Sequence, residues 1–299
     1  MSLAYQLLRA TVRALAWPPL DTARAAGRSL GRLAQRLDEK HRRIVQENLS
    51  LSFPEHEAAW VERTATGVFE HIGQVAAELP WLVHATPSEL RAATRMHGFE
   101  HMREGMARGR GVITLTGHLG NWEWASLVAK LEVPHPSAVV ARPLDWPPAD
   151  RWVNEWRSST GHQMVPKSSS ARALLRILRA GGMAGLLLDQ NVDWYDGVWV
   201  EFFGRQACTN KGGALLALRT GAVVLPFYSF RAPDGKLDVC FDPEIPLVRT
   251  GDKTHDVWAN TQNFTRALEN IIRRHPEQWF WLHQRWKTKP FQPWPRQNS

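Results

Sequence analysis

The 299-residue chain has few cysteines and no long apolar run, and each shortage excludes a class of protein. Its 2 cysteines, Cys208 and Cys240, provide neither a disulfide framework nor a zinc-binding pattern, so a reducing compartment is the default. No stretch reaches the roughly 18 consecutive apolar residues of a membrane-spanning helix. The first thirty residues also lack the uninterrupted apolar core of a cleavable signal peptide. We therefore expect any membrane contact to be peripheral.

Positive charge and tryptophan are abundant instead. The net charge is +8, which favours an anionic partner such as nucleic acid, an anionic membrane or an acidic protein. The 15 tryptophans are many for this length, and the indole ring is favoured at membrane–water boundaries, although several of them serve core packing alone. Hydrophobic residues make up 43% of the chain, which is enough for a sizeable core.

The amino-terminal region predicts two amphipathic helices, over residues 4–15 and 22–37. The second helix carries a basic stripe with an apolar face beside it. The stripe consists of Arg24, Arg28, Arg32 and Arg36, and the apolar face of Leu30, Leu33 and Leu37. Like charges four residues apart repel, and no acid within the stripe relieves them, which favours an anionic membrane over a solvated charged face. We therefore assign residues 1–40 to basic, membrane-associating helices and residues 41–299 to one further domain.

After a mostly helical first third, strand and helix patterns alternate. Helices are predicted at 57–83, with a break at Pro80, and at 88–96, and strands at 112–115, 137–140, 185–188 and 199–203. Residues 222–230 and 237–241 are expected to form an antiparallel pair. This alternation predicts an α/β fold, with a mixed central sheet flanked by helices and a helical amino-terminal region.

The stretch from Gly111 to Trp124 carries the strongest chemical signal. His118 follows an apolar strand at a glycine-rich turn, where open α/β sheets usually bind ligands, and Glu123 lies in the first turn of the next helix. The turn predicts that the Glu123 carboxylate holds one ring nitrogen of His118, leaving the other to accept a hydroxyl proton. The alternatives are a core histidine satisfied by a helix-capping glutamate and a metal site, for which two ligands are too few.

The chain also resembles a known family along roughly residues 30–288. The matching stretches are His118-Leu-Gly-Asn-Trp-Glu123, Asn48-Leu, Phe53-Pro54, Arg142-Pro143-Leu144, Asp189-Gln190, Phe202-Phe203-Gly204, Thr220-Gly221-Ala222, Leu225-Pro226, Pro276-Glu-Gln-Trp279, Trp281-Leu-His283 and Arg285-Trp-Lys287. In this order they resemble the late acyltransferases of lipid A biosynthesis, within the bacterial lysophospholipid-type acyltransferases. The amino terminus is more basic and less hydrophobic than the membrane anchor common in that family.

The resemblance implies transfer of a fatty acyl group from a thioester, carried by acyl carrier protein or CoA, to a hydroxyl of a phosphorylated glycolipid such as a lipid A precursor. It implies His118 as general base and Glu123 as its orienter, at the cytoplasmic face of the bacterial inner membrane. Because a thioester is already activated, no metal or cofactor is expected. Arg142 is expected to clamp a phosphate, with a structural salt bridge as its alternative. Further expected contacts to substrate are Asn121, Asp189, Phe203, Gly204 and Lys211.

Other functions stay open at this stage. A lysophospholipid, an aminolipid or a mannosylated lipid are alternative acceptors. A basic nucleic-acid-binding protein is a competing class, although the basic residues are scattered and no recognised nucleic-acid motif is present, so we expect no nucleic acid. A metal-dependent hydrolase built on His118, Glu123 and Asp189 is a second competitor, and chelator sensitivity distinguishes it from metal-free acyl transfer.

Overall fold

A computed structural model describes residues 2–133, 135–141, 144–166 and 170–290. The helices are α1 Leu3–Leu15, α2 Leu20–Leu37, α3 Glu39–Ser52, α4 Ala58–His84, α5 Pro87–Ala92, α6 Phe99–Ala107, α7 Trp122–Glu132, α8 Pro147–Ser159, α9 Ser170–Arg179, α10 Gly212–Thr220 and α11 Lys253–Arg274, followed by the 3₁₀ turn η2 Pro276–Gln278. The strands are β1 Thr94–His97, β2 Val112–Thr116, β3 Ser137–Ala141, β4 Gln163–Pro166, β5 Met183–Leu187, β6 Gly197–Phe202, β7 Arg205–Asn210, β8 Val223–Arg231 and β9 Leu237–Phe241.

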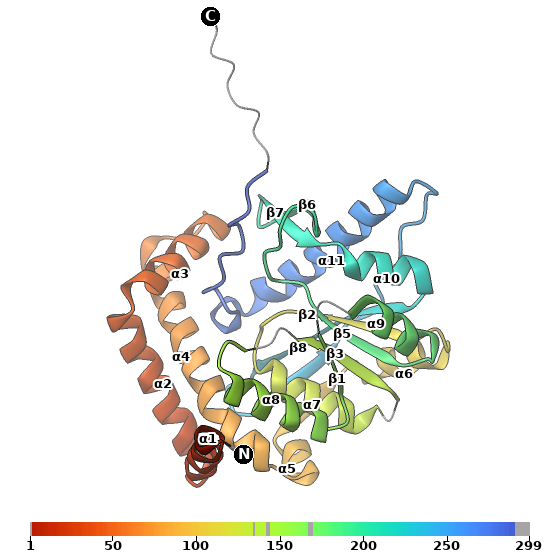
Figure 1. Ribbon diagram of the computed structural model, residues 1–299. Coiled ribbons are helices and arrows are strands. Elements are labelled where there is room, and N and C mark those ends of the chain that lie inside the picture. Colours follow the sequence, from red (N-terminus) through yellow and green to blue (C-terminus); the bar gives the residue numbers. More distant parts are fainter. Residues whose placement is uncertain (1, 134, 142–143, 167–169, 291–299) are drawn as a thin grey trace, which may run out of the picture.

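A seven-stranded mixed sheet forms the centre of the molecule, as the sequence predicted (Figure 1). The strand order is β1-β9-β8-β2-β5-β3-β4, and β6 and β7 form a separate hairpin. Strands β8, β2, β5, β3 and β4 run parallel to one another. Strand β9 runs antiparallel to β8 and parallel to β1, so the predicted antiparallel pair is confirmed. The carboxyl ends of β2 and β5 therefore lie side by side.

Helices cover both faces of the sheet. Alternate residues of β8 point to opposite faces, so Val224 and Tyr228 join one buried cluster and Val223 and Phe227 join the other. Helices α9, α10 and α11 pack on the first face, and α6 and α7 on the second (Figure 1). The loops that follow the carboxyl ends of the parallel strands are where a binding site is expected in such a sheet.

The amino-terminal helices α1 to α4 form one flank of the molecule (Figure 1). Helix α2 crosses α4 so closely that a Cβ atom at Gly31 would lie 2.1 Å from the Phe69 carbonyl oxygen. Helix α1 lies against α8 and α4. The domain boundary near residue 40 stays a prediction.

The arginine stripe of α2 has a different environment from the predicted one. Arg24 is buried and bonds Glu78 at 2.7 Å, and Arg32 bonds Glu70 at 2.8 Å. Arg28 donates to Gln74 Oε1 at 3.2 Å. Helix α4 thus supplies acids that the stripe itself lacks. The sequence pattern of α2 alone could not reveal these glutamates, because they belong to another helix. Three of the four arginines contact α4 and are not reserved for an anionic surface.

Two local predictions were also wrong, and one strand was missed. Helix α4 continues through Pro80, because Glu78 and Leu82 are buried on either side of it and hold both halves against the core. The helix predicted for 88–96 ends at Ala92, and the next residues form β1, which pairs with β9. Strand β7 was missed, although it pairs with β6 along its whole length.

Candidate active site

Two residues that follow neighbouring strands meet at one edge of the sheet. His118 follows β2 and Asp189 follows β5, and the ends of these strands pair through Thr116 and Leu187. Nδ1 of His118 lies 2.9 Å from Oδ1 of Asp189, and the main-chain N–H of His118 donates to Oδ2 at 2.6 Å. The Asp189 side chain is fully buried, whereas that of His118 keeps 16% of its surface exposed. The carboxylate therefore fixes both the backbone and the ring of His118.

The segment after α11 completes the surroundings of this pair. Nε1 of Trp279 donates to Oδ2 of Asp189 at 2.9 Å, so this oxygen accepts two N–H groups. The main-chain N–H of Phe280 donates to the His118 carbonyl at 3.0 Å. The imidazole of His283 is a further neighbour, with Nε2 at 3.4 Å from Nδ1 of His118. The buried carboxylate is thus fully hydrogen-bonded, as a buried charge must be.

Gly120 gives the His118 loop its path. Its φ of 59° lies in the left-handed region, and a Cβ atom there would lie 2.1 Å from the Ser229 carbonyl oxygen. Its N–H donates to the Gln278 carbonyl at 2.9 Å, and its carbonyl lies 3.0 Å from Nε2 of His71. Only glycine fits this turn, which places His118 before helix α7.

The charges of the site settle which groups are ionised near neutral pH. Burial lowers the pKa of His118, but the charge and hydrogen bond of Asp189 outweigh it, and the pKa stands above its ordinary value. Burial raises the pKa of Asp189, but His118 outweighs it and holds that pKa well below its usual range. Burial, the His118 charge and the Arg285 charge lower the pKa of His283 to about 4, against the opposing Asp189 charge. Asp189 is therefore a carboxylate and His283 is neutral.

Glu123 occupies a position different from the predicted one. The sequence placed its carboxylate at a ring nitrogen of His118, and the structure places Asp189 there. Oε2 of Glu123 accepts from Nε of Arg157 at 3.0 Å, and Oε1 accepts from Nη2 of the same side chain. The guanidinium of α8 matches both carboxylate oxygens, which explains why Glu123 faces it. The pair remains close enough for the Glu123 charge to raise the pKa of His118 and the Arg157 charge to lower it.

Asn121 is buried and its amide is fully used. Its Oδ1 accepts from the main-chain N–H of Trp124 at 3.0 Å and so caps α7, and its Nδ2 donates to Glu78 at 2.7 Å. At 1% exposure, its side chain is not placed to contact a substrate as predicted.

The other predicted contacts lie away from His118 or outside the described residues. Phe203 and Gly204, with φ of 52° and 66°, form the two-residue turn between β6 and β7, and the Phe203 ring is buried. Nζ of Lys211 donates to the Tyr195 carbonyl at 2.9 Å. Among the described contacts, none joins these three residues to His118. Arg142 lies outside the described residues.

Comparison with known proteins identifies the family. The sequence profile described as bacterial lipid A biosynthesis acyltransferase matches residues 3–288. The chain belongs to this family. The lipid A biosynthesis lauroyltransferase of Escherichia coli K12 is 28% identical over 267 residues, which cover 88% of this chain and 85% of the relative. The palmitoleoyltransferase of the same organism is 23% identical over 270 residues, which cover 88% and 84%.

A relative with another kind of acceptor in its name matches over a shorter range. The phosphatidylinositol mannoside acyltransferase of Mycolicibacterium smegmatis is 27% identical over 190 residues, which cover 62% of this acyltransferase and 60% of the relative. The predicted family and the predicted O-acyltransferase activity are confirmed by these matches. In the described part of the chain, no helix is both long and apolar enough to cross a bilayer.

Sequence reasoning missed several residues at the centre of this acyltransferase. Trp279 and His283 entered only through the stretches that carry the family resemblance, and no role was predicted for either. Arg157 gave no signal, because an arginine in a helix is ordinary and only the fold brings α8 beside α7. Asp189 was predicted, but as a substrate contact or as a ligand in the alternative metal site, and not as the hydrogen-bond partner of His118.

The same histidines raise the question of a metal. Ligand atoms of His118, Asp189 and His283 lie within 4.8 Å of one another. The donor set of two imidazoles and one carboxylate suits zinc. However, Oδ2 of Asp189 already accepts two N–H groups, and Oδ1 accepts from Nδ1 of His118. Hydrogen bonding alone satisfies this arrangement, and Glu123 of the predicted metal set is replaced by His283.

Proposed function

We propose that this acyltransferase moves a fatty acyl group from the thioester of acyl carrier protein or CoA to a hydroxyl of a phosphorylated membrane glycolipid, with a lipid A precursor as acceptor. The family and the names of the E. coli relatives support this reaction. One observation carries the proposal. The His118 ring is held by a buried carboxylate at Nδ1, and among the described residues Nε2 has no hydrogen-bond partner.

The arrangement suits a general base. An ionised Asp189 accepts a hydrogen bond from Nδ1–H of His118, so the neutral ring keeps its proton on Nδ1 and its lone pair on Nε2. That nitrogen takes the proton of the acceptor hydroxyl while the oxygen attacks the thioester carbonyl. When the tetrahedral intermediate collapses, the carbon–sulfur bond breaks and the imidazolium returns the proton to the thiolate. Asp189 stabilises the imidazolium between these steps.

Glu123 enters this proposal through Arg157. Its negative charge favours the imidazolium form of His118, and its two oxygens hold the Arg157 guanidinium beside the site. A fixed guanidinium suits an anionic phosphate or oxyanion. Arg142 stays proposed as a second phosphate contact, and Phe203, Gly204 and Lys211 as substrate contacts. The net charge of +8 suits an acidic carrier protein and a phosphorylated saccharide lipid.

A small cavity adjoins His118 and is mainly apolar. Its lining residues besides His118 are His71, Ile72, Val75, Trp122, Gln278 and Phe280. Aliphatic and aromatic side chains thus lie next to the base, at the place that the thioester must reach.

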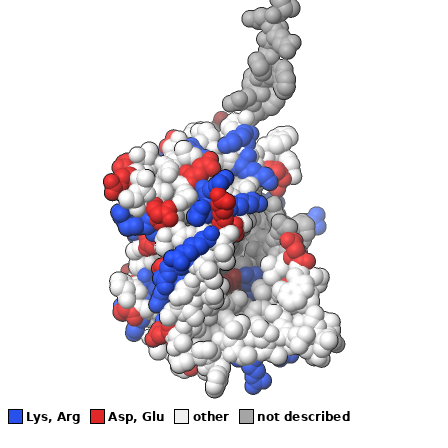
Figure 2. All heavy atoms as spheres, turned by 90° about the vertical axis from the view of Figure 1, so that its left-hand side faces the viewer, with Lys and Arg blue, Asp and Glu red and all other residues white. Residues whose placement is uncertain are grey.

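Exposed apolar side chains of α1, α2 and the turn between them support contact with a membrane, which we propose to be the bacterial inner membrane at its cytoplasmic face. The exposed ones are Leu3, Leu7, Leu15, Trp17, Leu30, Leu33 and Leu37. Trp17 is 91% exposed, and Leu37 is 76% exposed. Leu30, Leu33 and Leu37 share one face of α2, and patches of this kind mark contact surfaces. In Figure 2 the lower part of this flank, where α1 lies in Figure 1, carries few charged side chains. We propose that this surface rests on the bilayer.

Mass spectrometry of total lipids from cells with and without the gene tests the proposed acceptor. The proposal predicts lipid A species that gain one acyl chain only when the gene is present. A change confined to phospholipids, aminolipids or mannosylated lipids would assign the acceptor to that class instead. Relatives that are named for phosphatidylinositol mannoside acylation make the mannosylated lipid the first alternative to examine.

The cluster of His118, Asp189 and His283 favours one second candidate, a metal-dependent hydrolase. Dialysis against a chelator, followed by assays of thioester hydrolysis and of acyl transfer, separates the two. Acyl transfer through the His118–Asp189 pair predicts activity that chelation leaves unchanged. Loss of activity that zinc restores would favour the hydrolase.

A further inference from the structure

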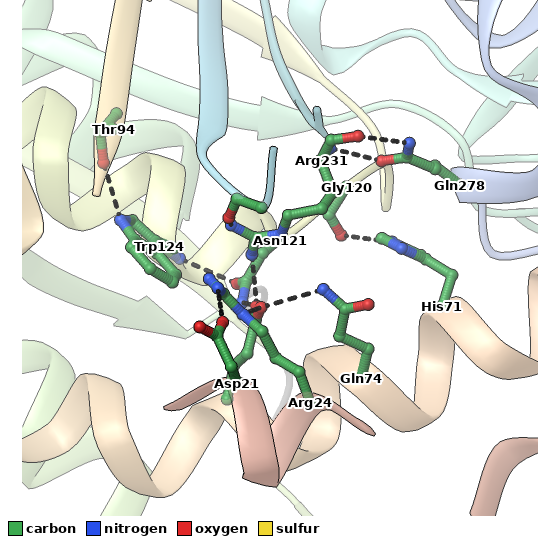
Figure 3. Close-up of polar contacts among 12 residues, drawn as sticks. Asp21, Arg24, His71, Gln74, Thr94, Gly120, Asn121, Trp124, Arg231 and Gln278 are labelled. Atoms are coloured by element: carbon green, nitrogen blue, oxygen red, sulfur yellow. Dashed lines mark hydrogen bonds and ion pairs between the residues drawn. The ribbon is translucent and has the colours of Figure 1, made fainter. Parts of the chain in front are cut away.

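Glu78 of α4 lies at the centre of a buried polar network next to the His118 loop. Figure 3 shows Arg24, Gln74 and Asn121, whose side chains belong to this network. Its Oε1 accepts from Nε of Arg24 at 2.7 Å and from Nε2 of Gln74 at 3.2 Å. Its Oε2 accepts from Nδ2 of Asn121 at 2.7 Å and from Nη2 of Arg231 at 2.5 Å. Four donors from α2, α4, the His118 loop and β8 therefore meet on one carboxylate, which has no exposed surface.

Asn121 connects this carboxylate to the base. It lies three residues after His118, and its side chain caps α7 through the Trp124 N–H. Because Oδ1 accepts there and Nδ2 donates to Glu78, the amide has one orientation only. The position of Glu78 thus fixes the end of the loop that carries His118.

Helix α4 also contacts the His118 loop through His71, which lies two helical turns before Glu78. Nε2 of His71 lies 3.0 Å from the Gly120 carbonyl oxygen. Burial lowers the pKa of His71, so the ring is neutral and donates this hydrogen bond. Consecutive residues, Gly120 and Asn121, are therefore bonded to His71 and Glu78 of one helix (Figure 3).

The charges of the network explain why a carboxylate is needed. The guanidinium groups of Arg24 and Arg231 both lie over the Trp124 ring, at 5.8 and 4.9 Å from its centre. Of the two carboxylates bonded to Arg24, that of Asp21 is 92% exposed, so Glu78 is the buried counter-charge for both arginines. Without it, two buried cations would repel each other beside the amino terminus of α7.

We propose that Glu78 is a positioning residue for acyl transfer, which holds the His118 loop in its reactive place through Asn121. The proposal rests on the function proposed above, with His118 as the base. Because Glu78 also holds Arg24, it joins α2, the helix with the exposed leucine face, to the catalytic loop. Displacement of the base should lower the rate of acyl transfer even when the substrates still bind, because the reaction requires the reacting atoms to be close and correctly oriented.

The test compares three variants of the full chain. Glu78→Gln removes the counter-charge, and Asn121→Ser keeps a capping oxygen but loses the amide N–H that reaches Glu78. Asp21→Asn is the matched control, because it removes the exposed carboxylate on Arg24 without touching Asn121. We would measure kcat and KM per folded molecule, and the pH titration of the His118 ring by NMR.

We expect Glu78→Gln and Asn121→Ser each to lower kcat roughly tenfold or more with KM changed by less than about threefold. The double variant should be no slower than the slower single one, since both break one connection. The His118 titration should shift in both, and Asp21→Asn should match the wild type. Should Glu78→Gln not fold, Asn121→Ser decides alone.

Wild-type kcat and an unchanged His118 titration in Asn121→Ser would overturn the proposal, even if stability falls. A failure of the proposed function has a different signature, since His118→Ala would then be as active as the wild type. The NMR titration does not depend on activity and separates the two cases.

Discussion

Asp189 holds His118 at two points, with Oδ1 at 2.9 Å from the ring Nδ1 and Oδ2 at 2.6 Å from the main-chain nitrogen. Trp279 donates a third N–H, to Oδ2 at 2.9 Å. Both carboxylate oxygens therefore accept, and no donor is available from Asp189 to reverse the ring. This fixes the tautomer in which Nδ1 carries the proton and Nε2 the lone pair.

Replacement of Asp189 by asparagine should reverse that tautomer. The two N–H groups at Oδ2 require the amide oxygen there, which turns the amide NH₂ toward Nδ1 of His118. The ring would then carry its proton on Nε2 and lose its function as base. We expect Asp189→Asn to lower kcat about a hundredfold or more in an acyl-transfer assay.

Glu123→Gln provides the comparison for that variant. Because Glu123 acts through Arg157 and through its charge, we expect a smaller loss of kcat than in Asp189→Asn, and a smaller one still in Glu123→Asp. The same assay, run on all three proteins, ranks the two carboxylates. A larger loss in Glu123→Gln would return the role of orienter to Glu123, as the sequence alone predicted.

The pH dependence of kcat/KM should follow His118. A base must be neutral to accept a proton, and Asp189 raises the pKa of His118 against the effect of burial. Activity should therefore rise with pH through a midpoint above about 6.5, the ordinary histidine value. Glu123→Gln removes a charge that favours the imidazolium, so its midpoint should move to lower pH. A wild-type midpoint below about 6.5 would contradict the pairing.

Membrane contact should depend on the leucine face of α2 more than on its arginines. The double variant Leu33→Glu with Leu37→Glu should bind vesicles roughly tenfold or more weakly in a sedimentation assay. The reason is that the wild-type leucines gain free energy when they move from water into the bilayer. The control Leu215→Glu, at an exposed leucine of α10, should bind normally. Raising salt from about 0.1 M to about 1 M should have a modest effect, since α4 already contacts Arg24, Arg28 and Arg32. Salt-sensitive binding that ignores the leucines would support the arginine stripe.

More of the fold than of the site could be predicted from the sequence. Strand and helix periodicity predicted the mixed sheet and the antiparallel pair of β8 and β9, because alternation is a local property. The turn at Gly120 predicted where His118 lies, because a strand followed by glycines and a helix is also local. Pairing is not local: Glu123 is close to His118 in the sequence, whereas Asp189 reaches His118 only because β5 pairs with β2.

The remaining errors have the same cause. Within α2 an acid pairs with Arg24 alone, through Asp21, and the crossing with α4 supplies Glu70, Gln74 and Glu78 to Arg32, Arg28 and Arg24. Likewise, the family resemblance implied Asn121 as a substrate contact, whereas its amide group bonds Glu78 of α4 and the Trp124 N–H. Contacts between distant segments decide the role of each polar group.

The most direct test of the central claim is the mass of the product that the purified enzyme forms from acyl carrier protein thioester and a lipid A precursor. The account predicts a product heavier by one acyl chain with the wild type. It predicts a rate lower by roughly a hundredfold or more with folded His118→Ala. A preference for acyl-CoA would change only the donor. Acylation of lysophosphatidic acid in place of the disaccharide, or near-wild-type transfer by His118→Ala, would contradict the account.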